Sequence, residues 1–108
     1  MMLVCTCPDG TDTKIRLKTV SHAPPVTMGR GKEADICVED PKCSRVHCAI
    51  RYWDDIFVIR DKNSSNGTFV NGEKIEVARL NPGDMVKIGE TEMRLLSDEN
   101  RTDVTMTG

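Results

Sequence analysis

The chain has 108 residues, of which 38% are hydrophobic and 30% are charged, and its formal net charge is -2 at pH 7. This length and hydrophobic content favour one folded domain and exclude disorder as the general state of the chain. The chain lacks the basic surplus of a general nucleic-acid binder, so we expect no nucleic-acid partner.

The N-terminus, MMLVCTCPDG, has neither a basic stretch nor a long apolar run, unlike a signal peptide. No segment is apolar over the length that spans a bilayer, so we expect no membrane partner. The five cysteines are odd in number and scattered, which favours reduced thiols, several of them buried, over a disulfide framework. These features predict an intracellular protein, either cytoplasmic or nuclear.

Apolar residues recur along the chain with a period of two, which is typical of strands half-buried in a sheet. The first strand is expected in MLVCTC, and the next at 13–18, where Ile15 and Leu17 share a face. Further strands are expected at 35–38, 47–53, 56–60, 85–88 and 91–96. The segment IFVIR (56–60) is the most continuously apolar and predicts a central strand.

Turn signals separate these segments. They are Asp54-Asp55, Asn71-Gly72, the type II sequence Asn81-Pro82-Gly83-Asp84, and Gly89-Glu90. No window predicts an amphipathic helix, so the pattern indicates an all-β sandwich or barrel. We expect one domain at 1–97, followed by a polar, disordered tail at 98–108.

Two polar clusters lie between the early strands. In TMGRGKEAD (27–35), a strand ends at Gly29, and Arg30 presents a planar guanidinium that suits phosphate or carboxylate. In PKCSRVHCA (41–49), Ser44 adds a hydroxyl and Arg45 a second guanidinium just before a strand. We assign His47, which leads that strand, to support of the loop rather than to chemistry.

A third cluster, NSSNGTFVNG (63–72), contains two Asn-Gly pairs. Asn71-Gly72 joins two strands, whereas Asn66-Gly67 follows the polar residues Ser64 and Ser65, so the Asn66 amide is available for another partner. Together the three clusters offer arginines, hydroxyls and bendable backbone on loops, which is the inventory of a phosphate site.

In order and spacing, the motifs Gly29-Arg30, SRVH (44–47) and SSNGTFVNG (64–72) resemble the forkhead-associated (FHA) domain over roughly residues 13 to 97. This resemblance implies an antiparallel β-sandwich of two sheets with about eleven strands, as in the SMAD/FHA group of folds. It also implies a signalling module that binds phosphothreonine in partner proteins and is not an enzyme.

The resemblance further implies roles for individual residues. The expected phosphopeptide contacts are Arg30, Ser44, Arg45, Ser65 and Asn66, of which Asn66 faces the peptide backbone. The expected structural supports of the loops are Gly29, His47 and Gly67. The implied partner is a phosphothreonine protein or peptide made by a Ser/Thr kinase, with no cofactor and no metal. The module is expected to be a monomer or weak dimer.

Four other interpretations remain open from the sequence. The fold can serve as a phospho-independent scaffold or dimerisation module. Ser44 and His47, with a nearby Asp, can suggest a hydrolase, although no nucleophile elbow is present. Zinc ligands are available among the cysteines and His47, without paired C-x-x-C knuckles. Phosphorylation of a tail threonine (Thr102, Thr105 or Thr107) can direct the tail to its own site.

Overall fold

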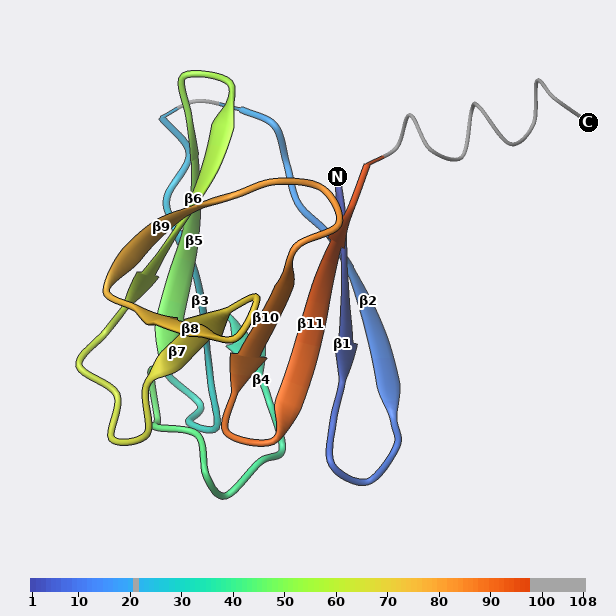
Figure 1. The fold of residues 1–108 in the computed structure, drawn as a ribbon, viewed down its shortest axis with the longest axis vertical. Coiled ribbons are helices and arrows are strands. Elements are labelled where there is room, and N and C mark those ends of the chain that lie inside the picture. The colour runs from blue at the N-terminus through green and yellow to red at the C-terminus, as the bar shows by residue number, and fades with distance from the viewer. Residues whose placement is uncertain (21, 98–108) are drawn as a thin grey trace, which may run out of the picture.

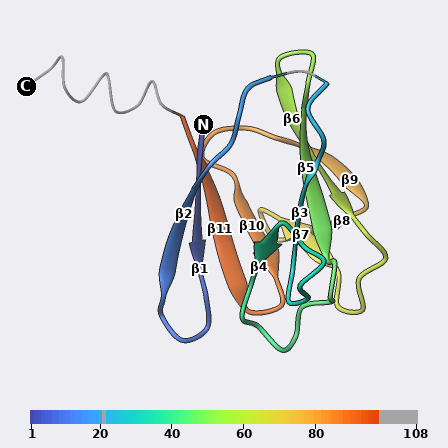
Figure 2. The same ribbon diagram turned by 180° about the vertical axis from the view of Figure 1, so that it is seen from behind.

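The computed structural model describes residues 1–20 and 22–97, and these form eleven β-strands without a helix. Six strands make one sheet and five make the other. The sheets face each other as two layers (Figure 1), and the view from behind shows the same arrangement (Figure 2). The predicted all-β sandwich and its number of strands are confirmed. The predicted tail, 98–108, lies outside the described residues.

The six-stranded sheet has the order β2-β1-β11-β10-β7-β8. Its strands are β1 (Met2–Thr6), β2 (Asp12–Arg16), β7 (Thr68–Val70), β8 (Glu73–Ile75), β10 (Met85–Ile88) and β11 (Thr91–Leu96). The five-stranded sheet has the order β4-β3-β5-β6-β9. Its strands are β3 (Val26–Gly29), β4 (Ile36–Cys37), β5 (Cys48–Trp53), β6 (Ile56–Asp61) and β9 (Val77–Leu80).

All the strand pairs are antiparallel except β3–β4, which is parallel. The segment IFVIR forms an interior strand, because β6 pairs with both β5 and β9. The strand β9 was not among the predicted segments. Burial alternates along this edge strand, but Val77 is apolar and exposed, so the sequence itself shows no clear alternation.

The core lies between the two sheets, because each strand turns alternate side chains inward. The clearest case is β11, in which Thr91, Met93 and Leu95 are buried while Glu92 and Arg94 are exposed. The core also contains three of the five cysteines (Cys5, Cys43 and Cys48). The prediction that several thiols are buried is therefore confirmed.

The predicted turns adopt the left-handed conformations that their residues favour. Asp54 and Asp55 have φ of 51° and 67°, and Asn71 and Gly72 have φ of 51° and 88°. Gly83 has φ of 94°, as a type II turn requires. The first two turns fix the register of the β5–β6 and β7–β8 hairpins, whereas the turn at Gly83 carries the chain from β9 to β10 in the other sheet.

The loops that carry the polar clusters gather at one end of the sandwich, the lower end in Figure 1. They are the β3–β4 loop (30–35), the β4–β5 loop (38–47) and the β6–β7 loop (62–67). The β10–β11 turn lies at the same end, whereas the β5–β6 turn lies at the opposite end (Figure 1). Within residues 1–20 and 22–97, no helix has the length and apolar character to cross a bilayer.

Candidate functional site

The β3–β4 and β4–β5 loops run backbone to backbone. The Arg30 N–H donates a hydrogen bond to the Ser44 carbonyl oxygen over 3.0 Å, and the Gly31 N–H donates to the Arg45 carbonyl oxygen over 3.0 Å. The Nε of Arg30 also donates to the Cys43 carbonyl oxygen over 2.8 Å. One edge of the Arg30 guanidinium is therefore anchored, although the residue as a whole remains exposed.

Only glycine allows so close an approach at position 29. A Cβ on Gly29 would lie 2.7 Å from both the Ser44 carbonyl oxygen and the Arg45 carbonyl carbon, and it would also collide with the Arg45 carbonyl oxygen. These are backbone atoms, which cannot move aside as a flexible side chain does. Any side chain at position 29 would push the two loops apart.

His47 links the β4–β5 loop to the β6–β7 loop from inside the protein. The side chain is fully buried. Its Nδ1 accepts a hydrogen bond from the Ser44 N–H over 3.0 Å, and its Nε2 lies 2.7 Å from the Gly67 carbonyl oxygen. This geometry requires the tautomer that carries its proton on Nε2. One imidazole thus satisfies a backbone donor and a backbone acceptor from two different loops.

Ser44 and Ser65 lie side by side although 21 positions separate them. The Ser65 N–H donates a hydrogen bond to the Ser44 Oγ over 3.0 Å. Ser44 is half-buried and Ser65 is exposed, so the contact lies where the two loops meet solvent. Two hydroxyl groups and a backbone amide are therefore close together beside the Arg30 loop.

Asp61, at the end of β6, holds the β6–β7 loop in shape. Its carboxylate accepts hydrogen bonds from the Ser64 hydroxyl over 2.5 Å, the Ser64 N–H over 3.1 Å and the Thr68 hydroxyl over 2.7 Å. Burial alone would raise the pKa of Asp61, but these hydrogen bonds outweigh it and lower that pKa. Asp61 was not predicted from the sequence, although an Asp three residues before a Ser is a recognised local bonding pattern.

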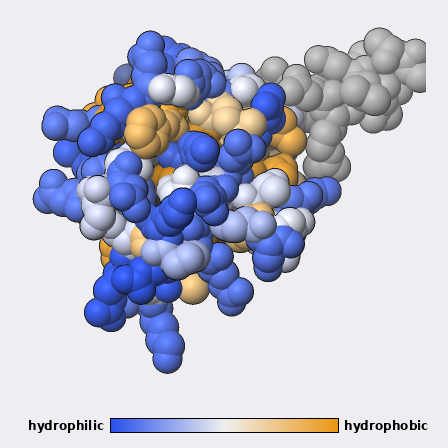
Figure 3. Space-filling model, turned by 60° about the horizontal axis from the view of Figure 1, so that its bottom comes forward, coloured by the Kyte–Doolittle hydropathy of each residue, from blue (hydrophilic) through white to orange (hydrophobic). Residues whose placement is uncertain are grey.

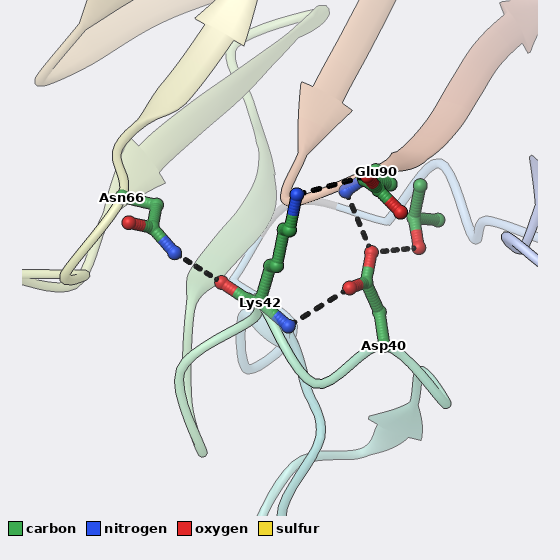
Figure 4. Close-up of polar contacts among 5 residues, drawn as sticks. Asp40, Lys42, Asn66 and Glu90 are labelled. Atoms are coloured by element: carbon green, nitrogen blue, oxygen red, sulfur yellow. Dashed lines mark hydrogen bonds and ion pairs between the residues drawn. The ribbon is translucent and has the colours of Figure 1, made fainter.

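Asp40 performs a similar task in the β4–β5 loop (Figure 4). This carboxylate, only 2% exposed, accepts hydrogen bonds from the Lys42 N–H (2.9 Å), the Glu90 N–H (2.7 Å) and the Thr91 hydroxyl (2.8 Å). Burial would raise the pKa of Asp40, but these hydrogen bonds hold it below its usual range. Asp40 therefore ties the loop to the β10–β11 turn. This residue was not predicted from the sequence either.

The Asn66 side chain extends toward Lys42 (Figure 4). Its Nδ2 donates to the Lys42 carbonyl oxygen over 2.7 Å, and the Lys42 ammonium pairs with Glu90 at 2.9 Å. Within the part of the chain that the structure describes, the Asn66 Oδ1 has no hydrogen-bond partner. The amide is thus oriented by one contact while its oxygen can accept a further hydrogen bond.

Arg45 projects beside the β3–β4 loop and forms an ion pair there. Its Nη2 lies 3.0 Å from Oε2 of Glu33, and both side chains are largely exposed. This partner was not predicted from the sequence. The five predicted contact residues, Arg30, Ser44, Arg45, Ser65 and Asn66, thus occur on three loops, of which the β4–β5 loop is hydrogen-bonded to each of the other two.

The Ser44 hydroxyl and the His47 imidazole are both used in hydrogen bonds between the loops. The Ser44 Oγ accepts from Ser65, and both nitrogens of His47 are engaged with backbone groups, so the pair is not arranged as nucleophile and base. No group of three or more His, Cys, Asp or Glu side chains with metal-binding geometry occurs among the described residues.

The surface at this end is mostly hydrophilic (Figure 3), which suits a polar ligand.

A comparison with protein families agrees with this arrangement of loops. The FHA domain model matches residues 26–89, from the start of β3 to the first residue after β10. The chain belongs to the FHA domain family. FHA domains are interaction modules rather than catalysts, and the match includes every one of the predicted site residues.

Relatives of known name and structure support the assignment. The chain is 32% identical over 85 residues to the FHA domain-containing protein FhaA of Mycobacterium tuberculosis, covering 79% of this chain and 15% of FhaA. The FhaA FHA domain in complex with the intracellular domain of Rv3910 superimposes with a TM-score of 0.73, at 28% identity, covering 85% of this chain and 97% of that one.

A structure from a study of phosphothreonine-dependent FHA domain interactions has a TM-score of 0.71 at 26% identity. It covers 90% of this chain and 97% of the other. The chain spans at most about half of the first curated relatives that it matches, for example 51% of the regulator GarA of Mycolicibacterium smegmatis.

Proposed function

We propose that this FHA domain binds phosphothreonine in a partner protein and so mediates a phosphorylation-dependent interaction. The ligand would be the product of a Ser/Thr kinase. The observation that carries the proposal is the joining of three polar loops, in which Ser65 bonds to Ser44 while Arg30 is anchored beside them. One structural neighbour comes from work on phosphothreonine-dependent FHA domain interactions, which supports the choice of ligand.

Each predicted residue has a chemical task in this proposal. Arg30 supplies charge and donors to the phosphate, whose charge at pH 7 is close to -2. The hydroxyl groups of Ser44 and Ser65 donate to phosphate oxygens, and Arg45 adds a second positive charge. The Asn66 Oδ1 accepts an N–H of the peptide backbone beside the phosphothreonine. Gly29, His47 and Gly67 hold the three loops together.

The expected affinity is modest. A charge-assisted hydrogen bond contributes about 1.5–3 kcal/mol net, and ordering of the bound peptide offsets part of this gain. A small contact patch of this kind is compatible with a Kd on the order of micromolar. Arg30 is assigned the charge-assisted hydrogen bonds to the phosphate, and its anchoring to the β4–β5 loop holds it in place for them. Removing the Arg30 side chain should therefore remove most of the specific affinity.

Calorimetry with peptide pools tests the proposal. A phosphothreonine pool should bind, and matched unphosphorylated and phosphoserine pools should bind weakly or not at all. Arg30→Ala should abolish binding, whereas Arg94→Ala, which removes the same charge from the exposed face of β11, should not. Absence of binding in every pool would overturn the proposal and favour a phospho-independent scaffold or dimerisation module.

A further inference from the structure

A glutamate and an arginine side chain face each other at the edge of the proposed site. Glu33 lies in the β3–β4 loop, three residues after Arg30, and its Oε2 is 3.0 Å from Nη2 of Arg45. Arg45 is one of the two guanidinium groups that the proposed function assigns to the phosphate. In the domain without ligand, the Glu33 carboxylate is therefore already paired with a guanidinium that the proposed function assigns to the phosphate.

The backbone of the loop is shaped to admit this carboxylate. A Cβ on Gly31 would lie 2.8 Å from Oε1 of Glu33 and 2.9 Å from the Cβ of Arg45. Both contacts are shorter than a real Cβ adopts, so a side chain at position 31 would displace the end of Glu33 or the Cβ of Arg45, and glycine leaves both in place. Gly31 is itself buried under the pair.

The groups around Glu33 favour its ionised form. Its own backbone N–H makes the largest contribution, partial desolvation opposes it, and the hydrogen bond and charge of Arg45 and the charge of Arg30 add to the lowering of the pKa. Glu33 is therefore anionic at neutral pH and lies within the field of both candidate phosphate-binding arginines.

We propose that Glu33 competes with the phosphate for Arg45 and so lowers the affinity of the site. The inference rests on the proposed function and concerns the same site. When a phosphothreonine binds, Arg45 either exchanges the carboxylate for phosphate or keeps a negative charge next to the dianion. Both courses weaken binding. Because both side chains are largely exposed, the ion pair opens readily and limits affinity without closing the site.

A double-mutant cycle measured by calorimetry tests this inference. Glu33→Gln should tighten the binding of the phosphothreonine pool by about two- to fivefold, the range expected from one exposed ion pair. In an Arg45→Ala background, this gain should fall by at least half. Glu92→Gln makes the same charge change on the exposed face of β11, away from the loops, and should leave Kd unchanged.

The outcomes distinguish the inference from the proposed function. If the wild type binds and Glu33→Gln leaves Kd unchanged or weakens binding, the competitor role is wrong while the reader function stands. If Glu92→Gln tightens binding as much as Glu33→Gln does, the effect is net charge alone and the inference is again overturned. If neither the wild type nor Glu33→Gln binds any phosphothreonine peptide, both proposals fail. Binding by Glu33→Gln alone would support the competitor role most strongly.

Discussion

The buried imidazole of His47 reaches across 20 residues of sequence to the carbonyl oxygen of Gly67, with its Nε2 2.7 Å from that atom. The same ring accepts a hydrogen bond from the Ser44 N–H. The β4–β5 and β6–β7 loops therefore depend on this one side chain for their relative position.

His47→Ala should lower the free energy of unfolding by about 2–5 kcal/mol, because it leaves a cavity and two unpaired backbone groups. Urea denaturation measures this loss. The exposed residue His22, which has φ of 71°, provides the matched control. His22→Asn should change stability by less than about 1 kcal/mol, since Asn tolerates that conformation. Equal losses in both variants would contradict the linking role of His47.

Gly29→Ala should separate the β3–β4 and β4–β5 loops, because its Cβ meets backbone atoms of Ser44 and Arg45 at 2.7 Å. We expect a cost of about 1–3 kcal/mol in the free energy of unfolding. Amide NMR shifts should change at residues 30–31 and 44–45 together. Gly10→Ala is the contrast, because Gly10 has φ of 88° but open space around it. This substitution should strain only the local backbone and leave the amide shifts of residues 30–31 and 44–45 unchanged. Unchanged shifts in Gly29→Ala would refute the prediction.

Ser65→Thr should sharpen the preference for phosphothreonine over phosphoserine. The extra methyl of Thr would add an apolar wall beside the ligand. One buried methyl is worth about 0.8 kcal/mol, or roughly a fourfold change in the ratio of the two Kd values. Paired peptides that differ only in the phosphorylated residue provide the measurement. A ratio that stays constant would show that Ser65 does not contact the ligand methyl.

Acid should destabilise the domain through Asp40 and Asp61, whose pKa values are lowered in the folded state. Their contribution to the free energy of unfolding is fully present above the unfolded pKa of about 3.9. It is lost as pH falls through the lower pKa values of the folded state. Asp40→Asn should therefore be much less stable than the wild type at pH 7, with the difference shrinking below about pH 4. Urea unfolding across this range tests the prediction.

Asp54→Asn is the control for net charge in that experiment, because Asp54 lies exposed in the β5–β6 turn with a φ that Asn tolerates. It should cost little stability at pH 7. If Asp40→Asn costs no more than this control, the carboxylate of Asp40 does not hold the β4–β5 loop to the β10–β11 turn.

The sequence by itself determined the fold class, because that information is local. Alternation along β11 shows directly which face is buried, and pairs such as Asn71-Gly72 favour the left-handed backbone of a hairpin turn. The order of the three polar motifs then indicated the family and the candidate residues. The short edge strand β9 was not predicted, because its exposed position 77 carries an apolar valine, which hides the alternation of burial from the sequence.

Only the tertiary structure decided how the site is held and what already occupies it. Asp40 meets Glu90 and Thr91 about 50 residues later in the chain, and such pairs leave no local pattern. The same is true of Arg45 and Glu33, whose side chains come from two different loops and meet beside the buried Gly31. Hydrogen bonds and ion pairs act over about 3 Å in space, whereas sequence patterns report only neighbours along the chain. Folding alone brings residues that are distant in the chain within this range.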